Sequence, residues 1–453
     1  MSADPTRITP ADAAGYEWGT TALNTWHGLA RYWRNRKSAR YHHRSIASMT
    51  SPAAAPALSP IRWRMPIALM IVTTINWFDR SAMSLALPKI AEEHGWSTTE
   101  IGANGARLIS LFFLGYGLAN LILSPIAERF GPRKALIVSV IAFSIATALN
   151  APFGATVAAL AGLRFLLGVA EGIHFPMASG IVSRWFPLNE RSRANGLFIL
   201  GIQVAVVAGP FIMVPLIGRF GWRGMFLALG AAGLLIALPA VIGILRDDGP
   251  YAQGDGGDGA PLWTVFRNPS YWLVLIAGVL SNIIAYGILT WLPTYLAKGR
   301  QVPFADLAAS ASIPFWLGAL SIPVWAILGD RTGRRAQFAS VGCGLAGIGV
   351  YFAAHSPGLA LTVAFLAGSL FFQNAYQTAE FALVQRILPP ERVGAATGLY
   401  NGISIILGGA GGTALVGKVV EATGSYDSGL MVVVVAGLLN FVVLGLLYRR
   451  IKY

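Results

Sequence analysis

Long apolar runs dominate this chain and constrain its fold more than any other feature. A run of about 20 residues, rising ~1.5 Å per residue in a helix, crosses the ~30 Å hydrocarbon core of a bilayer. We therefore expect an all-α membrane protein whose helices follow these runs. The predicted spans are 65–88, 105–127, 135–151, 156–179, 194–217, 222–245, 271–297, 305–328, 336–354, 358–383, 394–420 and 428–447.

The composition supports a multi-pass membrane protein. The chain is 55% hydrophobic and 12% charged, whereas soluble domains average about 25% charged residues. Its single cysteine, Cys343, excludes a disulfide framework and a cysteine-based metal site. We predict neither a metal nor a cofactor.

The positive charge is concentrated in particular segments. Residues 1–64 hold nine Lys and Arg against three acids and lack the apolar core of a signal peptide. They are predicted to be a disordered basic cytoplasmic arm near anionic lipid, and nucleic-acid binding is not expected. A translation start at Met49 is the alternative.

The connections between spans predict the topology. Basic residues cluster in the even-numbered connections and in the tail, so the positive-inside rule places both termini in the cytoplasm. We predict a first six-helix bundle at 65–245, a cytoplasmic linker at 246–270, a second six-helix bundle at 271–448 and a cytoplasmic tail at 449–453. The expected location is a bacterial inner (plasma) membrane, with the protein a monomer.

Two similar loops occupy the same place in each half. The loop after the second span carries an acid followed by basic residues, and a matching loop follows the eighth span, 202 positions later. This points to a duplicated unit with a site between the two bundles. The charged residues of both loops are predicted to form a cytoplasmic gate: Glu128, Arg129, Arg133, Asp330, Arg331 and Arg334.

The first apolar run contains an adjacent acid and base, Asp79 and Arg80. On insertion scales, each charge at the centre of a membrane helix costs roughly 2.5–3.5 kcal/mol, and such residues usually mark ion or substrate paths. The alternative is a structural ion pair that only holds helices together.

Several motifs resemble those of a known family. The two gate loops and the six-plus-six layout resemble the major facilitator superfamily. Within it, Asn76-x-x-Asp79-Arg80 looks like the first-helix signature of the anion:cation symporter family, and Arg164-x6-Glu171-Gly172-x2-Phe175-Pro176 resembles its fourth-helix motif. The resemblance implies transport of organic anions such as hexuronate, glucarate or galactonate, generally with protons. Trp77 stands where Tyr is usual, which leaves the substrate open.

Helix geometry predicts that the buried charges meet. Asp79 lies ~18 Å up its helix and Arg164 reaches a similar depth from the other side, while Glu171 falls two turns deeper. The resemblance favours Arg80 as a forked clamp for a substrate carboxylate. Asp79, Glu171 and Arg164 are predicted to couple protons, with Arg164 paired to one of the acids. His174 is a further candidate, although a lone helical histidine is more often simply packed.

Uncharged polar groups at comparable depths are predicted to bind the rest of the substrate. These groups are Tyr116, Gln203, Asn282, Tyr286, Gln373, Asn374 and Asn401. Hydrogen bonds between helices are the alternative role for each. Glu380 is expected near the cytoplasmic end of its helix, as a gate or surface charge.

These features together predict a secondary transporter that takes up an organic carboxylate with protons by alternating access. A facilitator or antiporter for another solute, such as an aromatic acid or a tartrate-like dicarboxylate, is a second reading. A membrane sensor is a third. An enzyme is not predicted, because the sequence shows no nucleophile-base arrangement.

Overall fold

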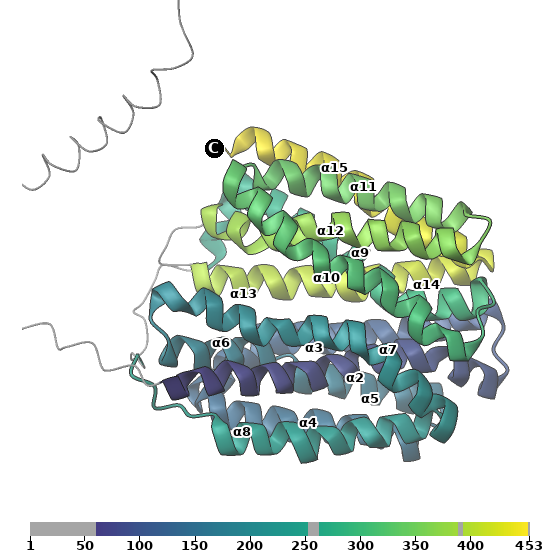
Figure 1. Ribbon diagram of the computed structural model, residues 1–453, viewed down its shortest axis with the longest axis horizontal. Coiled ribbons are helices and arrows are strands. Elements are labelled where there is room, and N and C mark those ends of the chain that lie inside the picture. Colours follow the sequence, from purple (N-terminus) through teal and green to yellow (C-terminus); the bar gives the residue numbers. More distant parts are fainter. Residues whose placement is uncertain (1–59, 252–261, 388–392, 452–453) are drawn as a thin grey trace, which may run out of the picture. The chain divides into compact units, whose positions relative to one another are not determined.

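The computed structural model describes residues 60–251, 262–387 and 393–451, and all regular structure in these ranges is helical (Figure 1). Residues 59–453 form one compact unit. The predicted basic arm lies almost entirely outside the described residues.

The first half of the chain begins with a short 3-10 turn and continues as helices. Its elements are η1 (Pro60–Trp63), α2 (Arg64–His94), α3 (Thr98–Arg129), α4 (Pro132–Phe153), α5 (Val157–Glu171), α6 (His174–Trp185), α7 (Leu188–Ala232), the π-helical η2 (Gly233–Ala237) and α8 (Leu238–Ile244). Local signals set the ends. Gly95 closes α2 in a left-handed conformation, and Ser97 and Glu100 form a capping box that starts α3.

The second half repeats the pattern. Its elements are η3 (Leu262–Arg267), α9 (Pro269–Thr294), the π-helical η4 (Tyr295–Gly299), η5 (Phe304–Asp306), α10 (Leu307–Thr332), α11 (Arg335–His355), α12 (Leu359–Ile387), α13 (Val393–Ser404), the π-helical η7 (Ile405–Ala410), α14 (Gly411–Thr423) and α15 (Tyr426–Arg450). Asn268 caps α9, with Pro269 at its first position.

The described residues contain ten helical segments that are long and apolar enough to cross a membrane, against the twelve predicted. Two features account for the difference. Residues 193–244 count as one 52-residue segment, although Gly221 (φ 70°, ψ 170°) interrupts the helix within it. The charged α2 is not among the ten. The fourth predicted run also differs, because α5 and α6 divide it at Gly172 and Ile173. The count of twelve stays a prediction.

The two halves lie side by side (Figure 1), and α2 begins at the same end of the bundle at which α15 ends. We call this the inner end, predicted to face the cytoplasm, and the opposite one the outer end. The halves are in close contact near the outer end, where Gly102 of α3 meets α14. A Cβ on Gly102 would lie 2.7 Å from the carbonyl oxygen of Gly417. Only glycine permits backbones this close.

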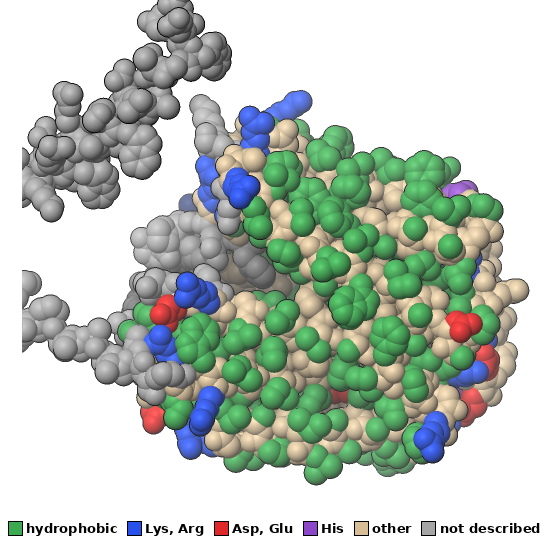
Figure 2. Space-filling model, viewed as in Figure 1, with side chains coloured by type: hydrophobic (Ala, Val, Ile, Leu, Met, Phe, Trp, Pro, Cys, Tyr) green, Lys and Arg blue, Asp and Glu red, His purple; other side chains and the backbone are tan. Residues whose placement is uncertain are grey.

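The flank of the molecule is suited to lipid. In Figure 2, hydrophobic side chains cover the surface between the two ends, and Lys, Arg, Asp and Glu gather mainly at the ends. The exposed apolar side chains include Ile122, Leu235 and Leu320, which are 58, 75 and 62% exposed. Apolar exposure on this scale is typical of a surface in contact with hydrocarbon.

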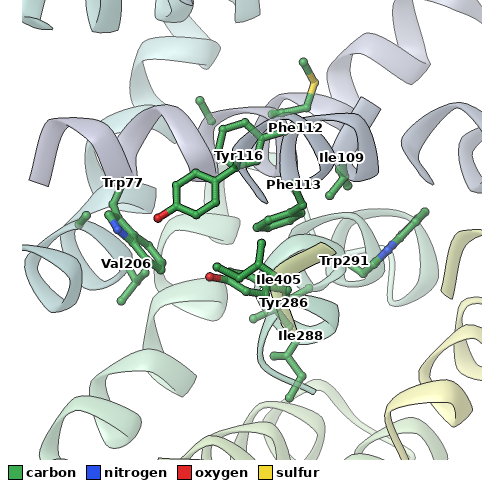
Figure 3. Packing of buried hydrophobic residues seen from close by; sticks show 14 of the residues in the cluster. Trp77, Ile109, Phe112, Phe113, Tyr116, Val206, Tyr286, Ile288, Trp291 and Ile405 are labelled. Carbon is green, nitrogen blue, oxygen red and sulfur yellow. The ribbon is translucent and has the colours of Figure 1, made fainter. Parts of the chain in front are cut away.

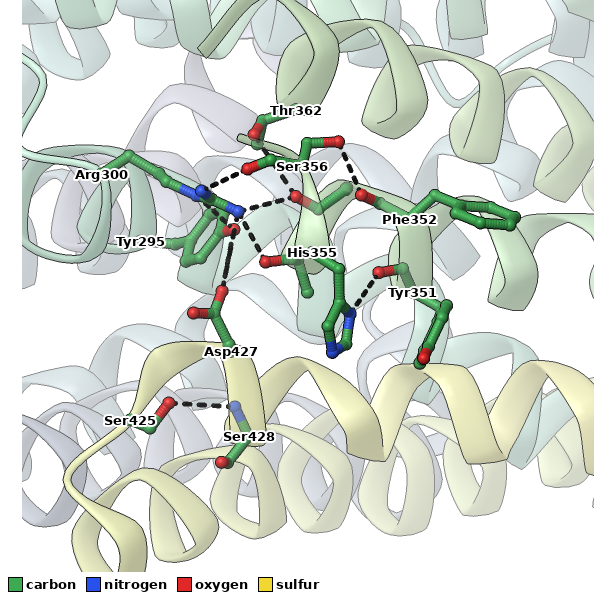
Figure 4. Close-up of polar contacts among 12 residues, drawn as sticks. Tyr295, Arg300, Tyr351, Phe352, His355, Ser356, Thr362, Ser425, Asp427 and Ser428 are labelled. Carbon is green, nitrogen blue, oxygen red and sulfur yellow. Dashed lines mark hydrogen bonds and ion pairs between the residues drawn. The ribbon is translucent and has the colours of Figure 1, made fainter. Parts of the chain in front are cut away.

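Arg300 ties three elements together at the outer end (Figure 4). Its guanidinium donates hydrogen bonds of 2.6–2.8 Å to the backbone carbonyls of Ala353, Ala354 and Ser356, at the end of α11. It also donates to the Tyr295 hydroxyl, which in turn donates to Asp427 at the start of α15. The end of α11 therefore gains donors for carbonyls that have no partner within the helix.

Replacing Arg300 with alanine should destabilise the second half. The change removes several charge-assisted hydrogen bonds, so we expect a loss of about 1.5–3 kcal/mol. Thermal unfolding in detergent should show a midpoint several degrees lower than that of the parent protein. Arg449→Ala, at an exposed position of α15, is the control. Equal midpoints for the two variants would contradict the role of Arg300.

Candidate functional site

A buried ion pair lies at the centre of the first half. Nη2 of Arg80 in α2 lies 3.4 Å from Oε2 of Glu171, the last residue of α5. The two side chains are only 1% and 0% exposed. The Arg80 guanidinium also stacks over the rings of Trp77 and Tyr116, at 4.4 and 4.5 Å from their centroids. Aromatic faces stabilise a cation that has lost its water.

Arg164 and Asp79 form a second contact beside this pair. Nη1 of Arg164 donates to the backbone carbonyl of Asp79 at 3.2 Å, and the guanidinium lies over the Phe112 ring. Arg80 thus pairs with an acid, whereas Arg164 bonds to a backbone oxygen rather than to the carboxylate expected from the sequence. The structure brings all four predicted charges into one cluster.

Acceptor atoms in this cluster remain unused. Within the described residues, no hydrogen bond within 3.5 Å reaches either carboxylate oxygen of Asp79 or Oε1 of Glu171, although Thr147 and Asn76 interact with these two carboxylates. The Asp79 carboxylate interacts electrostatically with Glu171 and Arg164. Buried polar atoms are usually hydrogen-bonded. The hydrogen-bond donors of the cluster therefore do not satisfy every oxygen of the two carboxylates.

His174 lies at the edge of the cluster. Its Nε2 forms a 2.9 Å hydrogen bond with the Thr73 hydroxyl of α2. It follows the break at Gly172 and Ile173, which turns the chain between α5 and α6. This hydrogen bond favours a structural role for His174, as a packed and hydrogen-bonded side chain, over a role in proton coupling.

Aromatic residues connect the cluster to the second half. The rings of Phe113 in α3 and Tyr286 in α9 are 4.3 Å apart. In Figure 3 the hydroxyls of Tyr116 and Tyr286 point to the same side of Phe113, towards Trp77. Tyr286 is within electrostatic range of Arg80. The predicted residues Tyr116 and Tyr286 therefore face the same region from opposite halves.

The other predicted polar residues divide into two groups. The Gln373 amide donates to the hydroxyl of Ser281 at 2.6 Å, and the Asn374 amide donates to the carbonyl of Gly318 at 2.7 Å. These hydrogen bonds join α12 to α9 and α10, which matches the alternative role of hydrogen bonding between helices. The other three are half-buried and form no side-chain hydrogen bond within the described residues: Gln203, Asn282 and Asn401.

The predicted gate residues form no ion pair between the halves within the described part of the chain. Arg133 bonds within its own half, where its backbone N–H donates to Asp247 and its guanidinium to the carbonyl of Ile242. The remaining gate residues whose side chains are described are exposed: Glu128, Arg129, Arg331 and Arg334. The side chain of Asp330 lies outside the described residues. The cytoplasmic gate stays a prediction.

Glu380 differs from its expected role as a surface charge. It is half-buried, and its Oε1 accepts a 2.8 Å hydrogen bond from the Tyr400 hydroxyl, which contacts the Tyr376 hydroxyl at 2.7 Å. The spacing is a weak signal of this arrangement, because Tyr376 stands one turn before Glu380 on α12. Tyr400 lies on another helix, and spacing alone does not reveal its contact.

The charged cluster is enclosed by packed side chains. Two surface pockets, of about 460 and 230 Å³, lie along α10, α11 and α12 near Phe338. Neither is lined by a residue of the cluster. The packed rings of Phe112, Phe113 and Tyr116 cover it instead.

An ion pair joins the halves at the outer end. Nζ of Lys298 lies 2.9 Å from Oε1 of Glu92, and Nζ of Lys89 lies 2.7 Å from Oε2 of the same carboxylate. Burial raises the pKa of Glu92, but the hydrogen bonds from Lys89 and Lys298 outweigh it and leave this pKa below its ordinary value. A lowered pKa means that the contact holds above the ordinary value and is lost as the pH falls through the lowered one.

Glu92→Gln should loosen the outer end. An exposed pair contributes at most about 1 kcal/mol, so we expect up to about a fivefold increase in labelling of Ala106→Cys, which packs against Gly417. The native Cys343 is buried and adds little background. The ratio of the labelling rate in the Glu92→Gln variant to that in the parent should approach one in acid, because protonated Glu92 also loses the ion pair. Lys298→Gln should increase labelling in the same way. Equal labelling of variant and parent at every pH would contradict the proposal that this ion pair holds the outer end closed.

The fold and the site together define a class of protein: a multi-pass integral membrane protein with charges buried near the contact of two helical halves. Comparisons place it in a family. Residues 69–318 and 301–453 match the family model of the Major Facilitator Superfamily. The chain belongs to this superfamily, and the organic-anion resemblance noted in its motifs is confirmed.

Known relatives agree with this assignment. A probable sulfoacetate transporter of Cupriavidus necator is 29% identical over 79% of this chain and 87% of its own length. A probable L-galactonate transporter of Escherichia coli is 30% identical over 57% of this chain and 59% of its own length. A bacterial homologue of the human lysosomal transporter Spinster, solved in an inward-facing and unoccupied conformation, superimposes with a TM-score of 0.71. It is 19% identical and covers 86% of this chain and 96% of its own.

Proposed function

We propose that this protein is a secondary active transporter that couples uptake of an organic carboxylate to protons by alternating access. The observation that carries the proposal is the buried contact of Arg80 with Glu171, beside an Asp79 whose carboxylate oxygens accept no hydrogen bond within the described residues. The names of the relatives support an organic anion as substrate.

Arg80 is the proposed substrate clamp. Its guanidinium lies 4.4 and 4.5 Å from the ring centroids of Trp77 and Tyr116, with Tyr286 nearby from the second half. A planar guanidinium can donate two parallel hydrogen bonds to a carboxylate. A substrate carboxylate would therefore compete with Glu171 for the same donors.

Proton coupling follows from this competition. When Glu171 takes up a proton, its attraction to Arg80 weakens and the guanidinium becomes available to the substrate. Asp79 acts beside it, held by Arg164 through the backbone. Loading one anion with protons also limits the net charge that has to enter the apolar interior. The monomeric state and the bacterial inner membrane location belong to the same proposal.

Arg80→Lys should reduce uptake into proteoliposomes at least about 100-fold. Lysine keeps the charge but loses the forked geometry and the ring stacking, which removes more than one charge-assisted hydrogen bond. Uptake of galactonate and of an aromatic acid is measured with a pH gradient imposed. Arg450→Lys, at an exposed position, is the matched control. Normal transport by the Arg80 variant in a folded state would reject the clamp.

Glu171→Gln should abolish accumulation driven by the pH gradient while retaining exchange of labelled for unlabelled substrate. Glutamine keeps the shape of the side chain but cannot exchange a proton. Counterflow and gradient-driven uptake are measured on the same vesicles. Accumulation equal to that of the parent protein would remove Glu171 from the proton path. A parent protein that exchanges substrate but does not accumulate it with the pH gradient would favour a facilitator.

A further inference from the structure

The second half contains a carboxylate that the proposed mechanism does not use. Glu380 of α12 lies about 10 Å from the inner end of its helix, seven residues before Ile387. No Lys, Arg or His nitrogen lies within 4.0 Å of it in the described part of the chain. Glu380 is half-buried, and partial loss of water without a nearby cation is unfavourable for a carboxylate. A bound ligand with a hydrogen-bond donor would offset this cost.

Two tyrosines orient this carboxylate. The Tyr400 hydroxyl donates its only proton to Oε1 of Glu380, so the proton in its contact with Tyr376 comes from Tyr376. The hydrogen bonds therefore run in one direction, from Tyr376 through Tyr400 to Glu380. Oε2 accepts no hydrogen bond from the described residues. One acceptor oxygen is fixed in place, and the other remains available.

The carboxylate lies on the side of the second half that faces the charged cluster. Tyr400 packs against Gly278 of α9, where a Cβ would overlap its hydroxyl and lie 2.7 Å from Cζ. Gly278, Asn282 and Tyr286 are spaced four residues apart and share one face of α9. Tyr286 is within electrostatic range of both Arg80 and Glu380. A cation of the first half and an anion of the second half thus act on the same tyrosine.

We propose that Glu380 is a second recognition group of the substrate site, selecting an organic monoanion whose far end carries a hydrogen-bond donor over a dianion. This inference rests on the proposed function, with Arg80 holding the substrate carboxylate. Oε2 accepts a hydrogen bond from a hydroxyl or an ammonium group at the opposite end. A second carboxylate there has no proton to donate and is repelled by Glu380 across a medium of low dielectric constant.

Family membership does not decide this point. Among the relatives, sulfoacetate carries two acid groups and galactonate carries one. The charge of the substrate therefore varies within the family, and residues that belong to the individual chain have to set it.

The test is competition between acids that differ only at the terminal carbon. The probes are galactonate, galactarate, 6-deoxygalactonate and 6-amino-6-deoxygalactonate, each competing for uptake by the full-length protein in liposomes. We expect galactonate to compete at least tenfold better than galactarate, and 6-deoxygalactonate to be weaker than galactonate. The amino compound shows whether a hydroxyl or an ammonium is preferred.

Glu380→Gln should lower the ratio of galactonate to galactarate affinity at least fivefold, and Tyr400→Phe should lower it by less. The ratio does not depend on the amount of folded protein, so partial misfolding leaves the result readable. Glu421→Gln, an exposed acid of the same half, should leave the ratio unchanged. An unchanged ratio in Glu380→Gln, or a parent protein that prefers galactarate, overturns the inference but leaves anion transport intact. Uptake of neither acid by the parent overturns the inference, and the proposed function is overturned as well only if the parent also takes up no aromatic acid.

Discussion

The contact between Arg80 and Glu171 is the constraint around which the first half is built. Each charge loses its water, and the attraction between them regains only part of the cost, so replacement by packed apolar side chains is often neutral or stabilising. The surrounding helices reduce the cost in specific ways. Trp77 and Tyr116 offer ring faces to Arg80, and Phe112 covers Arg164. A chain selected only for stability would have no need of this arrangement.

The contact between the halves is of a different kind. At the outer end it depends on backbone approach at Gly102 and Gly417, and on one exposed ion pair between Lys298 and Glu92. Neither involves interlocked long side chains, and the ion pair is weakened by water and salt. Elsewhere side chains pack across the contact: Ile406 lies against Gly117, Leu121 against Gly402, and the rings of Phe113 and Tyr286 are 4.3 Å apart. The outer end is therefore the part of the contact at which the proposed alternating access has the fewest side-chain contacts to break.

The sequence predicted an all-helical fold and the grouping of the buried charges, because both depend on length along a helix. The cluster of Asp79, Arg80, Arg164 and Glu171 followed from counting ~1.5 Å per residue. Rotation about the helix axis was harder to predict. Lipid and protein interior are both apolar, so no polar stripe marks the inward face. Gln373 and Asn374 were expected to face the substrate, yet they bond to Ser281 and Gly318.

Because rotation about the helix axis could not be predicted, neither could the hydrogen-bond partner of each buried charge. Arg80 reaches Glu171 from a different depth because its side chain is long and flexible, and Arg164 turns to a backbone oxygen. The buried cluster of the first half is electrically balanced, with two arginines and two acids. Within the described residues, Glu380 of the second half accepts a hydrogen bond only from Tyr400, which contacts Tyr376. In the proposed site, an incoming anion would therefore meet its cation in one half and a negative charge in the other, so the far end of the substrate would have to donate a hydrogen bond rather than accept one.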